Sequence, residues 1–560
     1  MRSTLLKKMI DNPETSLYEA FCDGVELGGN NAPALLFMNA KFSYGKVKRE
    51  IDLLSAALYN IGVKKGDVVT AALPNIPQTV YFLYASNAVG AVAYPVHALS
   101  SAEQIGEMMH NTGSKVLFAL DSFASTYEPL CKDKGYTLIS CNPTYGLNFF
   151  VQTAYNIKNK TNLTYAQDYV SFVKNNAGTG LNINNIVRLE PKETAVLLNS
   201  GGTSGIPKTV ELSAFALNAL CRNGYGLLDT KDVVGKYMLS VLPYFHGFGL
   251  CMGLHAMLWH GGCNVLLPKF KRKTAVAYVR KGKINYMIGV PALYSAMLSH
   301  KGFSGKCLKN ITIGFVGGDF VPQTVIDAFD ERMKSNGSSA RLFEGYGLTE
   351  TVTVACVNTH KDNKRGTVGR AVGGVEIRAL ETDTLREFGM IGGEDGCGEL
   401  CLRGDTLMNG YYKDPEATEK TFFVDGDGVR WLKSGDYGFV DGDGFVHFKQ
   451  RLKRILKVSG VSVFPAEIEQ AVSRVDGVSQ VCAHAVPDEK KGTAIRLVVE
   501  TRLPDFEALR KEIESVIENS LSRDCAPKEI VFTKSIPLTK MNKIDIETLK
   551  TLSAEELATR

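Results

Sequence analysis

Apolar residues near the start of the chain recur with the spacing of a helix. Val47, Ile51, Leu54 and Leu58 fall three or four positions apart, and Gly62 follows where such a helix would end. This pattern predicts an amphipathic helix that buries one face and leaves the other in water.

Short apolar runs then alternate with helical segments. Buried strands are predicted at residues 67–73, 91–96 and 115–120, with helices between them at residues 77–88 and 101–110. A β-α-β-α-β order favours a parallel sheet covered by helices over a sandwich or a helical bundle.

The same alternation returns after residue 190. A strand predicted at residues 194–198 leads into a glycine-rich loop, and further strands are predicted at residues 237–242, 264–267, 286–290 and 311–316. Helical stretches such as residues 322–334 separate these strands, which indicates a second wound sheet. The predicted fold class is therefore α/β.

Between residues 131 and 187 the periodicity is weak, because Asn, Lys, Tyr and Thr are interleaved. We expect an insertion or lid-like excursion here. Four aromatic residues mark the segment, namely Tyr145, Phe149, Phe150 and Tyr155. Packing against the body of the protein is the favoured interpretation, since most aromatic side chains are core, and contact with an apolar substrate or a membrane is the alternative.

Composition narrows the class of protein without naming it. The 560 residues are 44% apolar and 22% charged, as in a soluble globular enzyme, and the net charge of +5 is small beside 64 basic and 59 acidic side chains. No dense Lys/Arg block predicts a nucleic-acid partner. The twelve cysteines contain no CxxC pair, so we expect neither a zinc site nor a disulfide framework, and a reducing, cytoplasmic location.

Neither export nor a membrane span is predicted. The first residues become polar at Asp11-Asn12-Pro13 before a signal-peptide core can form. Residues 247–268 are the most apolar run, but glycines and two histidines, His255 and His260, interrupt them. A buried helix followed by a strand is expected there.

The glycine-rich loop carries the first chemical signal. It reads Ser200-Gly201-Gly202-Thr203-Ser204-Gly205-Ile206-Pro207-Lys208. Glycines let the backbone curl until several N–H groups point at one anion, while hydroxyls and a lysine add donors and positive charge, so the loop suits phosphate. A Walker-type loop requires Gly before Lys-[Ser/Thr], and Pro207 stands there. By itself the loop is also compatible with a plain polar surface turn.

Five further stretches follow the loop in a fixed order. They are Pro243-Tyr244-Phe245-His246-Gly247, Gly345-Tyr346-Gly347-Leu348-Thr349-Glu350, Gly398-Glu399-Leu400 with Gly410-Tyr411-Tyr412, Trp431-Leu432-Lys433-Ser434-Gly435-Asp436, and Pro537-Leu538-Thr539-Lys540-Met541-Asn542-Lys543. Together with the loop, this series resembles the adenylate-forming superfamily of acyl-CoA synthetases, peptide-synthetase adenylation domains and firefly-type luciferases. The resemblance covers about residues 42–549, and the ordered set is far more specific than any single motif.

The resemblance implies roles for the loop and for the residues after it. The members of the loop that would hold the β- and γ-phosphates of ATP are Ser200, Gly201, Gly202, Thr203, Ser204, Gly205 and Lys208. Glu350 with Thr203 would hold Mg²⁺, and Thr349 would contact the α-phosphate. Such cations and donors are needed because a carboxylate must attack an anionic phosphate.

Other matching positions would bind the rest of the nucleotide. The resemblance implies that Tyr346 stacks on adenine, that Asp436 accepts both ribose hydroxyls, and that Gly318 and Arg451 also border the nucleotide. The superfamily usually has Gly-Arg where this chain has Gln450-Arg451.

Two residues are expected to act on the acid. Lys543 would bring its ammonium to both the carboxylate and the α-phosphate, although Asn542 stands where the superfamily usually has glycine. His246 matches the segment that borders the carboxylate pocket of acyl-CoA synthetases. Amino-acid-activating relatives usually have Asp here, so His246 argues against an amino-acid substrate.

A domain boundary is predicted at residues 451–454. Residues 1–450 would form the large AMP-binding domain of wound sheets, and residues 455–560 a small, mobile α+β lid whose helix buries Leu509 and Ile513. Lys453 matches the superfamily's pivot and is the predicted hinge.

These features together predict a ligase that uses ATP, Mg²⁺ and coenzyme A to activate a fatty or aryl acid through acyl-AMP. The main alternative is an adenylating enzyme that loads the phosphopantetheine thiol of a carrier protein. A non-catalytic nucleotide-binding protein would be expected to lack Lys543, Glu350 or Asp436, and all three are present. The chain length of the acid and the oligomeric state are not predicted.

Overall fold

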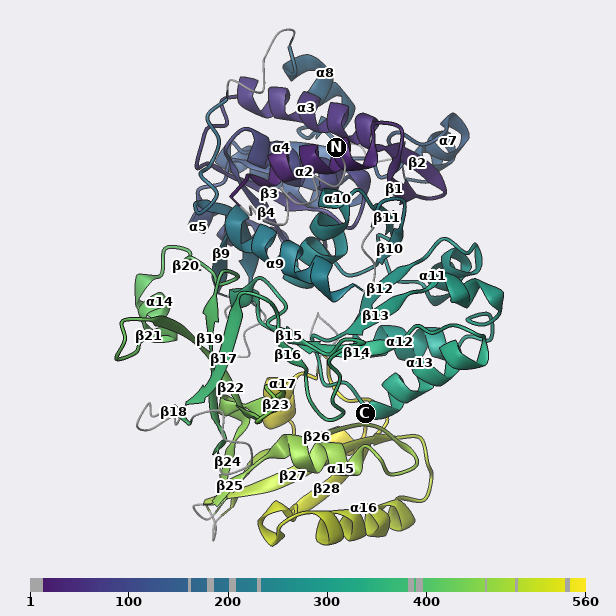
Figure 1. The fold of residues 1–560 in the computed structure, drawn as a ribbon, viewed down its shortest axis with the longest axis vertical. Helices are drawn as coiled ribbons and strands as arrows, with labels where there is room; N and C mark the ends of the chain where they lie inside the picture. Colours follow the sequence, from purple (N-terminus) through teal and green to yellow (C-terminus); the bar gives the residue numbers. More distant parts are fainter. Residues whose placement is uncertain are drawn as a thin grey trace. The chain divides into compact units, whose positions relative to one another are not determined.

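The computed structural model describes residues 14–159, 163–178, 186–200, 208–228, 233–380, 387–388, 396–458, 461–488, 492–538 and 544–560. The chain divides into two compact units (Figure 1). Unit 1 comprises Met1–Glu376 and Arg403–Leu432, and unit 2 comprises Ile377–Leu402 and Lys433–Arg560. The architecture is α/β, with a smaller C-terminal α+β part, as the sequence predicts.

The first sheet of unit 1 has eight strands in the order β20-β9-β8-β4-β3-β5-β6-β7. Its strands are β3 (Val68–Ala72), β4 (Val92–Pro95), β5 (Val116–Leu120), β6 (Thr137–Cys141), β7 (Gln167–Asp168), β8 (Thr194–Asn199), β9 (Thr209–Ser213) and β20 (Gly410–Tyr411). Strands β3, β4 and β5 are parallel, which confirms the predicted β-α-β-α-β unit.

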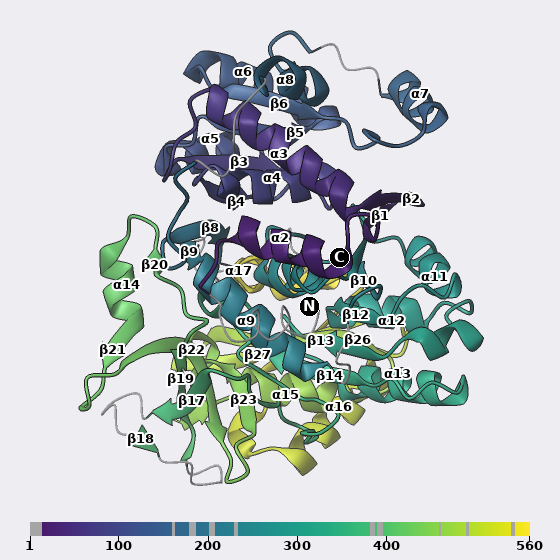
Figure 2. The same ribbon diagram turned by 45° about the horizontal axis from the view of Figure 1, so that its top comes forward.

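Helices cover this sheet (Figure 2). Helix α4 (Pro77–Ala88) is buried along its whole length because it lies between the sheet and α3 (Tyr44–Asn60). Helix α5 (Ala102–Thr112) begins with a capping box formed by Ser101 and Gln104, which satisfies otherwise unpaired N–H groups at its start.

The prediction of an excursion at residues 131–187 is wrong for much of that segment. Strand β6 pairs in parallel with β5, and β7 pairs with β6, so the chain continues the sheet. Helix α6 (Asp121–Lys134) supplies the crossover before β6, and α7 (Phe149–Lys158) and α8 (Tyr169–Asn176) follow. Strand β6 is five residues long. Polar residues surround it in the sequence, so the apolar pattern that would predict it is weak.

The second sheet of unit 1 has nine strands in the order β16-β15-β14-β13-β12-β10-β11-β1-β2. They are β1 (Pro33–Phe37), β2 (Ala40–Ser43), β10 (Tyr237–Ser240), β11 (Cys263–Leu266), β12 (Tyr286–Gly289), β13 (Ile313–Val316), β14 (Leu342–Tyr346), β15 (Cys356–Val357) and β16 (Arg370–Ala371). The strands from β11 through β14 run parallel, which confirms the predicted second wound sheet.

Helices α11 (Arg272–Arg280), α12 (Pro291–Leu298) and α13 (Gln323–Ser335) contribute apolar side chains to the core on this sheet. Helix α2 (Leu17–Gly28) packs against α4 and against α10 (Ala256–Trp259). Residues 247–268 form a π-helix, η2 (Phe248–His255), followed by α10 and β11. This confirms the predicted helix followed by a strand. In the described part of the chain, no helix has the length and apolar character that a membrane span requires.

A six-stranded sheet has the order β18-β17-β19-β22-β21, with β23 paired to β22. Its strands are β17 (Val375–Leu380), β18 (Glu387–Phe388), β19 (Gly398–Gly404), β21 (Phe422–Val424), β22 (Arg430–Val440) and β23 (Val446–Arg451). Asp441 and Gly444 form the turn between β22 and β23, where the Gly444 N–H donates to the Asp441 carbonyl at 2.8 Å.

The C-terminal part of unit 2 has its own core. The hairpin of β24 (Leu456–Val458) and β25 (Val461–Val463) precedes a sheet of β26 (Val478–Asp488), β27 (Gly492–Thr501) and β28 (Glu529–Thr533). Helices α15 (Pro465–Val472) and α16 (Phe506–Ser520) share an apolar core with this sheet, and α17 (Ile546–Thr551) and α18 (Ala554–Ala558) end the chain. Leu509 and Ile513 are buried, as predicted.

Candidate functional site

Two chain segments of unit 1 approach each other closely at glycines. A Cβ atom at Gly347 would lie 1.5 Å from the Thr353 carbonyl oxygen, and one at Gly247 would lie 1.8 Å from the Val352 carbonyl oxygen. These contacts join the segment after β10 to the segment after β14, at the carboxyl ends of parallel strands. Ligands of wound α/β sheets commonly bind at this edge.

The same contacts bring several predicted site residues into one region. His246 precedes Gly247, while Tyr346 ends β14 and is followed by the 3₁₀-helix η4 (Thr349–Thr351), which contains Thr349 and Glu350. Gly318 follows β13 and has φ of 81°, a conformation that favours glycine. The structure therefore gathers the candidate residues contributed by the second sheet.

Val352 is a strained residue that the sequence did not reveal. It is fully buried and has φ of 62° and ψ of −57°, and the Thr353 N–H donates to the Thr351 carbonyl across it at 2.7 Å. A β-branched residue in this turn is costly, by about 1–3 kcal/mol, and such strain concentrates at functional sites. No sequence pattern marks it, because valine normally favours extended backbone.

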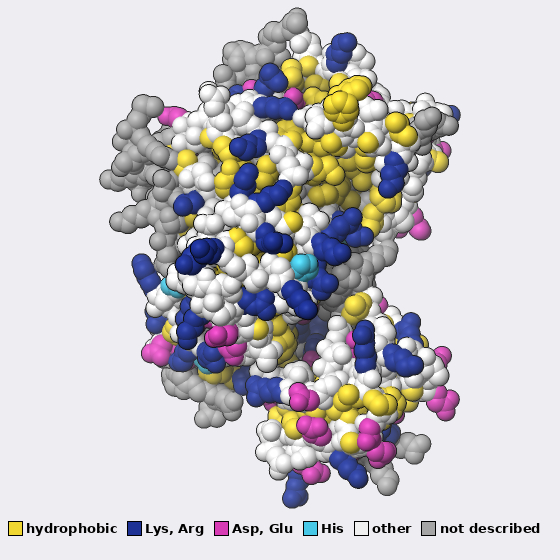
Figure 3. All heavy atoms as spheres, turned by 90° about the vertical axis from the view of Figure 1, so that its right-hand side faces the viewer, with side chains coloured by type: hydrophobic (Ala, Val, Ile, Leu, Met, Phe, Trp, Pro, Cys, Tyr) yellow, Lys and Arg dark blue, Asp and Glu magenta, His cyan; other side chains and the backbone are white. Residues whose placement is uncertain are grey.

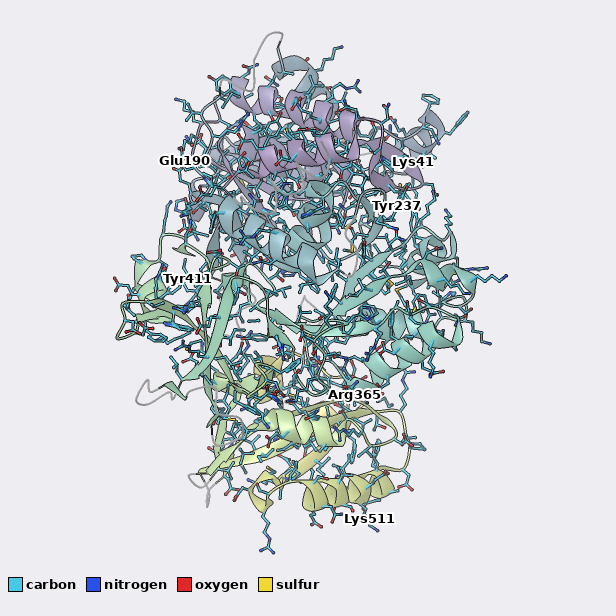
Figure 4. The ribbon with its side chains drawn as sticks, viewed as in Figure 1. Lys41, Glu190, Tyr237, Arg365, Tyr411 and Lys511 are labelled. Carbon is cyan, nitrogen blue, oxygen red and sulfur yellow. The ribbon has the colours of Figure 1, made fainter. Side chains whose placement is uncertain are left out.

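Lys208, Tyr411 and Glu350 form a connected group. The Lys208 ammonium lies 4.3 Å from the centre of the Tyr411 ring, and the Tyr411 hydroxyl donates to Glu350 Oε1 at 2.8 Å. Tyr411 belongs to β20, which pairs with β9 beside the loop, and Figure 4 labels it there. Burial and the neighbouring carboxylate raise the pKa of Tyr411. The sequence alone indicates no role for Tyr411.

Both ends of the glycine-rich loop are fixed by the hairpin of β8 and β9. The Ser200 N–H donates to the Lys208 carbonyl at 2.8 Å. Beside Ser200, the Asn199 side-chain oxygen accepts hydrogen bonds from the hydroxyls of Tyr94 at 2.8 Å and Thr209 at 3.1 Å. The predicted phosphate ligands between these ends lie outside the described residues; they are Gly201, Gly202, Thr203, Ser204 and Gly205.

His246 lies among aromatic and apolar side chains. Its ring centre is 4.4 Å from that of Phe245, which in turn meets His97 edge-on at 4.9 Å. Leu242 and Phe248, which flank His246 in the sequence, are partly buried and pack with Met252 and Phe315 against an apolar cluster of the second sheet. His97 is a further candidate that the sequence analysis missed, because no motif surrounds it.

Glu344 is a partly buried carboxyl group close to this region. It lies on β14, two residues before Tyr346, and borders a small hollow together with Arg341, Lys364 and Arg365. Burial raises its pKa to about 8, because a charged carboxylate is poorly solvated there. A largely protonated carboxylic acid at neutral pH is therefore expected at this position.

Unit 2 brings together two other predicted residues. Asp436 on β22 faces Arg451 on β23 in the strand register, and the Arg451 Nε atom lies 3.0 Å from Asp436 Oδ1. The Asp436 side chain is fully buried, whereas that of Arg451 is 51% exposed. The next residues form the 3₁₀-helix η6 (Leu452–Arg454), in which Lys453 is exposed. Lys543 lies outside the described residues.

The described residues fit a magnesium ion held mainly by phosphate. They contain no group of three His, Cys, Asp or Glu side chains suited to a metal. Mg²⁺ in nucleotide sites is commonly bound by one or two carboxylates together with phosphate oxygens and water. Glu350 offers such a carboxylate, and within the described chain its side-chain hydrogen bond is the one from Tyr411.

Comparison with known proteins supports a common origin. Residues 26–412 match the family model described as AMP-binding enzyme, and residues 467–543 match the AMP-binding enzyme C-terminal domain. A long-chain-fatty-acid–CoA ligase of Salmonella typhimurium is 28% identical over 91% of this chain and 90% of its own length. The 4-coumarate–CoA ligase 3 of Oryza sativa subsp. japonica is 27% identical over 97% of this chain and 93% of its own length.

A solved structure shares the fold. The crystal structure of ATP-bound MatB from Rhodopseudomonas palustris superimposes with a TM-score of 0.80 at 20% identity, covering 96% of this chain and 98% of that chain. The family matches do not fix the predicted boundary at residues 451–454, which stays a prediction.

Proposed function

Because the chain belongs to the family of AMP-binding enzymes, we propose that it is an AMP-forming ligase that joins a carboxylic acid to coenzyme A. ATP would activate the acid as acyl-AMP with release of pyrophosphate, and the thiol of coenzyme A would then displace AMP. The observation that carries the proposal is the connected group of Lys208, Tyr411 and Glu350 beside the glycine-rich loop. The group supports the proposal because a polyphosphate and its metal would need a cation and a carboxylate of this kind.

The substrate we propose is a fatty or aryl acid without an amino group. His246 stands where an acidic partner for an α-ammonium would be expected, and the side chains beyond it are apolar, including Phe248 and Met252. An apolar lining favours an acid whose tail gains from leaving water. The two curated relatives, a fatty-acid and a coumarate ligase, agree with this class without choosing between its members.

Each residue has a defined task in the proposed reaction. The loop from Ser200 to Lys208 would hold the β- and γ-phosphates, with Tyr411 fixing both the Lys208 ammonium and the Glu350 carboxylate. A magnesium ion bound by Glu350 would neutralise phosphate charge. Thr349 would orient the α-phosphate, and His246 would position the acid.

The remaining contacts would come from the second sheet of unit 1 and from the C-terminal part of the chain. Asp436 would accept the ribose hydroxyls, with Arg451 holding its carboxylate, and Tyr346 and Gly318 would border the adenine. Lys543 would lower the repulsion between the incoming carboxylate and the α-phosphate, a preorganised electrostatic effect.

Pyrophosphate release against a panel of acids tests the proposal. The panel runs from acetate through long fatty acids to benzoates, each with no thiol, with coenzyme A, or with a phosphopantetheinylated carrier protein. We expect release that depends on an apolar acid, with thioester formed from coenzyme A. Thioester formed on the carrier protein alone would instead establish the alternative acceptor, and no acid-dependent release from any acid would contradict the proposal.

Lys543→Ala should abolish acid-dependent pyrophosphate release while sparing thioester formation from supplied acyl-AMP. The loss should be large, about 100-fold or more, as for other preorganised donors. Lys540→Ala is the matched control, since it removes the same charge three residues away. Equal activity in the two variants would remove Lys543 from the proposed site.

A further inference from the structure

Helix α7 (Phe149–Lys158) attaches to unit 1 through its polar side. Gln152, Tyr155 and Asn159 are spaced at one helical turn and share one face of the helix and its C-terminal cap. Tyr155 donates its hydroxyl to Asp121 Oδ1 at 2.7 Å, and the Gln152 amide donates to the Leu147 carbonyl at 2.8 Å. None of the ten residues of this helix is buried.

The opposite side of α7 is apolar and faces water. Phe150, Ala154 and Ile157 are four and three residues apart, so they form a stripe along the helix. Phe150 is 82% exposed and Ile157 is 70% exposed, and Phe149 beside them is 75% exposed. An ordinary surface helix has the reverse arrangement, with its apolar face towards the core. The predicted packing of the aromatic cluster therefore holds for the tyrosines and is wrong for the two phenylalanines.

The charge around α7 is positive. Residues 142–167 contain no Asp or Glu, whereas Lys158 ends the helix and Lys160 follows. Lys46 lies next to the segment before the helix, where its ammonium donates to the Gly146 carbonyl at 3.3 Å. Lys41, on β2, is exposed on the same side of unit 1 (Figure 4). In Figure 3, hydrophobic side chains on this face of unit 1 are surrounded mainly by lysine and arginine.

The carboxylates that accept hydrogen bonds from Tyr145 and Tyr155 are buried, whereas Asp168, which follows the acid-free segment, is exposed. Asp121 and Glu50 are 7% and 6% exposed. Asp121 accepts the Tyr155 hydroxyl, and Glu50 accepts the Tyr145 hydroxyl at 3.1 Å. They lie on the inner side of α7, so its outer side presents apolar rings and cations.

We propose that α7 docks unit 1 on the surface of an anionic lipid bilayer, with Phe150 and Ile157 inserted among the acyl chains. The helix protrudes at the rim of the unit in both ribbon views (Figures 1 and 2), and the exposure of Phe150 and Ile157 shows that the stripe faces solvent. Interfacial helices combine such an apolar face with nearby lysines that attract anionic headgroups. This inference concerns binding and does not rest on the proposed catalytic function.

Vesicle binding by the full-length protein tests the inference. Flotation is measured with phosphatidylcholine vesicles that either contain or lack phosphatidylglycerol. The wild type should bind the anionic vesicles more strongly, and salt should weaken binding. The double variant Phe150→Ser/Ile157→Ser should bind the anionic vesicles at least about tenfold more weakly than the wild type, because the inserted apolar area is lost.

Val424→Ser is the matched control, since Val424 is a 63% exposed apolar residue on β21 of the same unit. It should bind vesicles as the wild type does. Melting temperatures of both variants should match the wild type, because the altered side chains are exposed. Absence of wild-type binding, or equal binding by the double variant, would overturn the inference. The inference would also be overturned if the wild type were a dimer that does not bind vesicles and the double variant were a monomer, because the stripe would then cover a second copy of the chain.

Discussion

Single residues set how closely the segments of the site approach. At Gly347 and Gly247 the facing backbone occupies the space of a side chain, so no larger residue fits without moving a carbonyl. Val352 stores strain in the same turn. Glu344, on the strand that leads into this turn, adds a partly buried acid whose pKa is raised by burial.

Replacing Glu344 by glutamine should reduce the dependence of stability on pH. The pKa of Glu344 is raised by burial from 4.5 to about 8, so between these values the folded protein binds more protons than the unfolded chain. The free energy of unfolding should therefore fall as pH rises through this window, because the carboxyl group ionises readily in the unfolded chain but not in the folded protein. The effect should be on the order of 2–4 kcal/mol.

Urea unfolding of the wild type and Glu344→Gln between pH 5 and pH 8 measures this effect. The variant should lose less stability across the window, and Glu331→Gln, at an exposed position, should behave as the wild type. Parallel pH profiles for wild type and Glu344→Gln would show that the carboxyl group is ionised throughout.

At the scale of elements, the junction after β23 is the part most suited to reorientation. Arg451 ends the strand, Lys453 lies in a single 3₁₀ turn, and Arg454 pairs with Glu469 at 2.5 Å on the far side. A short turn between a strand and a fixed ion pair can absorb a backbone rotation without disturbing a core. This supports the hinge that we propose at residues 451–454.

Lys453→Pro should separate the two half-reactions of the proposed enzyme. Proline fixes φ near −65° and restricts the residue before it, so it should trap one arrangement of the hinge. Pyrophosphate exchange should stay mostly intact, whereas thioester formation from acyl-AMP and coenzyme A should slow by about 100-fold or more.

Lys453→Ala controls for the loss of the charge and should leave both half-reactions near wild type. The two rates are measured separately, with acyl-AMP supplied for the second. If proline slows both half-reactions equally, or neither, residue 453 is not the hinge.

The sequence predicted elements well where one apolar period continued for several turns. Helices α3 and α4 and the strands β3 to β5 follow their predicted ranges within a few residues. Strands β6 and β9 were missed because each lies among polar or loop-like sequence, whereas β3 and β5, of the same length, have clear apolar runs. The π-helix η2 could not be predicted, since its apolar composition is that of any buried helix.

At the scale of the whole molecule, the order of the motifs predicted the family, whereas their places in the fold differ: the loop follows β8 and the Pro243–Gly247 stretch follows β10, but Gly398-Glu399-Leu400 lies within β19. Sequence alone could assign Tyr346 and Glu350 through their motif. Sequence alone could not identify Tyr411 as the partner of Lys208 and Glu350. These residues are about 200 and 60 positions away from Tyr411, and they meet it only because β20 pairs with β9. The sequence likewise could not predict which face of α7 is exposed, because this depends on the direction in which each side chain points in the fold.

The central claim is that the carboxylic acid is activated as acyl-AMP. The most direct measurement uses an accepted acid labelled with ¹⁸O in both carboxylate oxygens, together with ATP and coenzyme A. One labelled oxygen attacks the α-phosphate, and the later cleavage of the carbon–oxygen bond leaves it on AMP. The account predicts AMP with one ¹⁸O and a thioester that retains the other. Label in inorganic phosphate with ADP as the nucleotide product, or AMP without label, would contradict it.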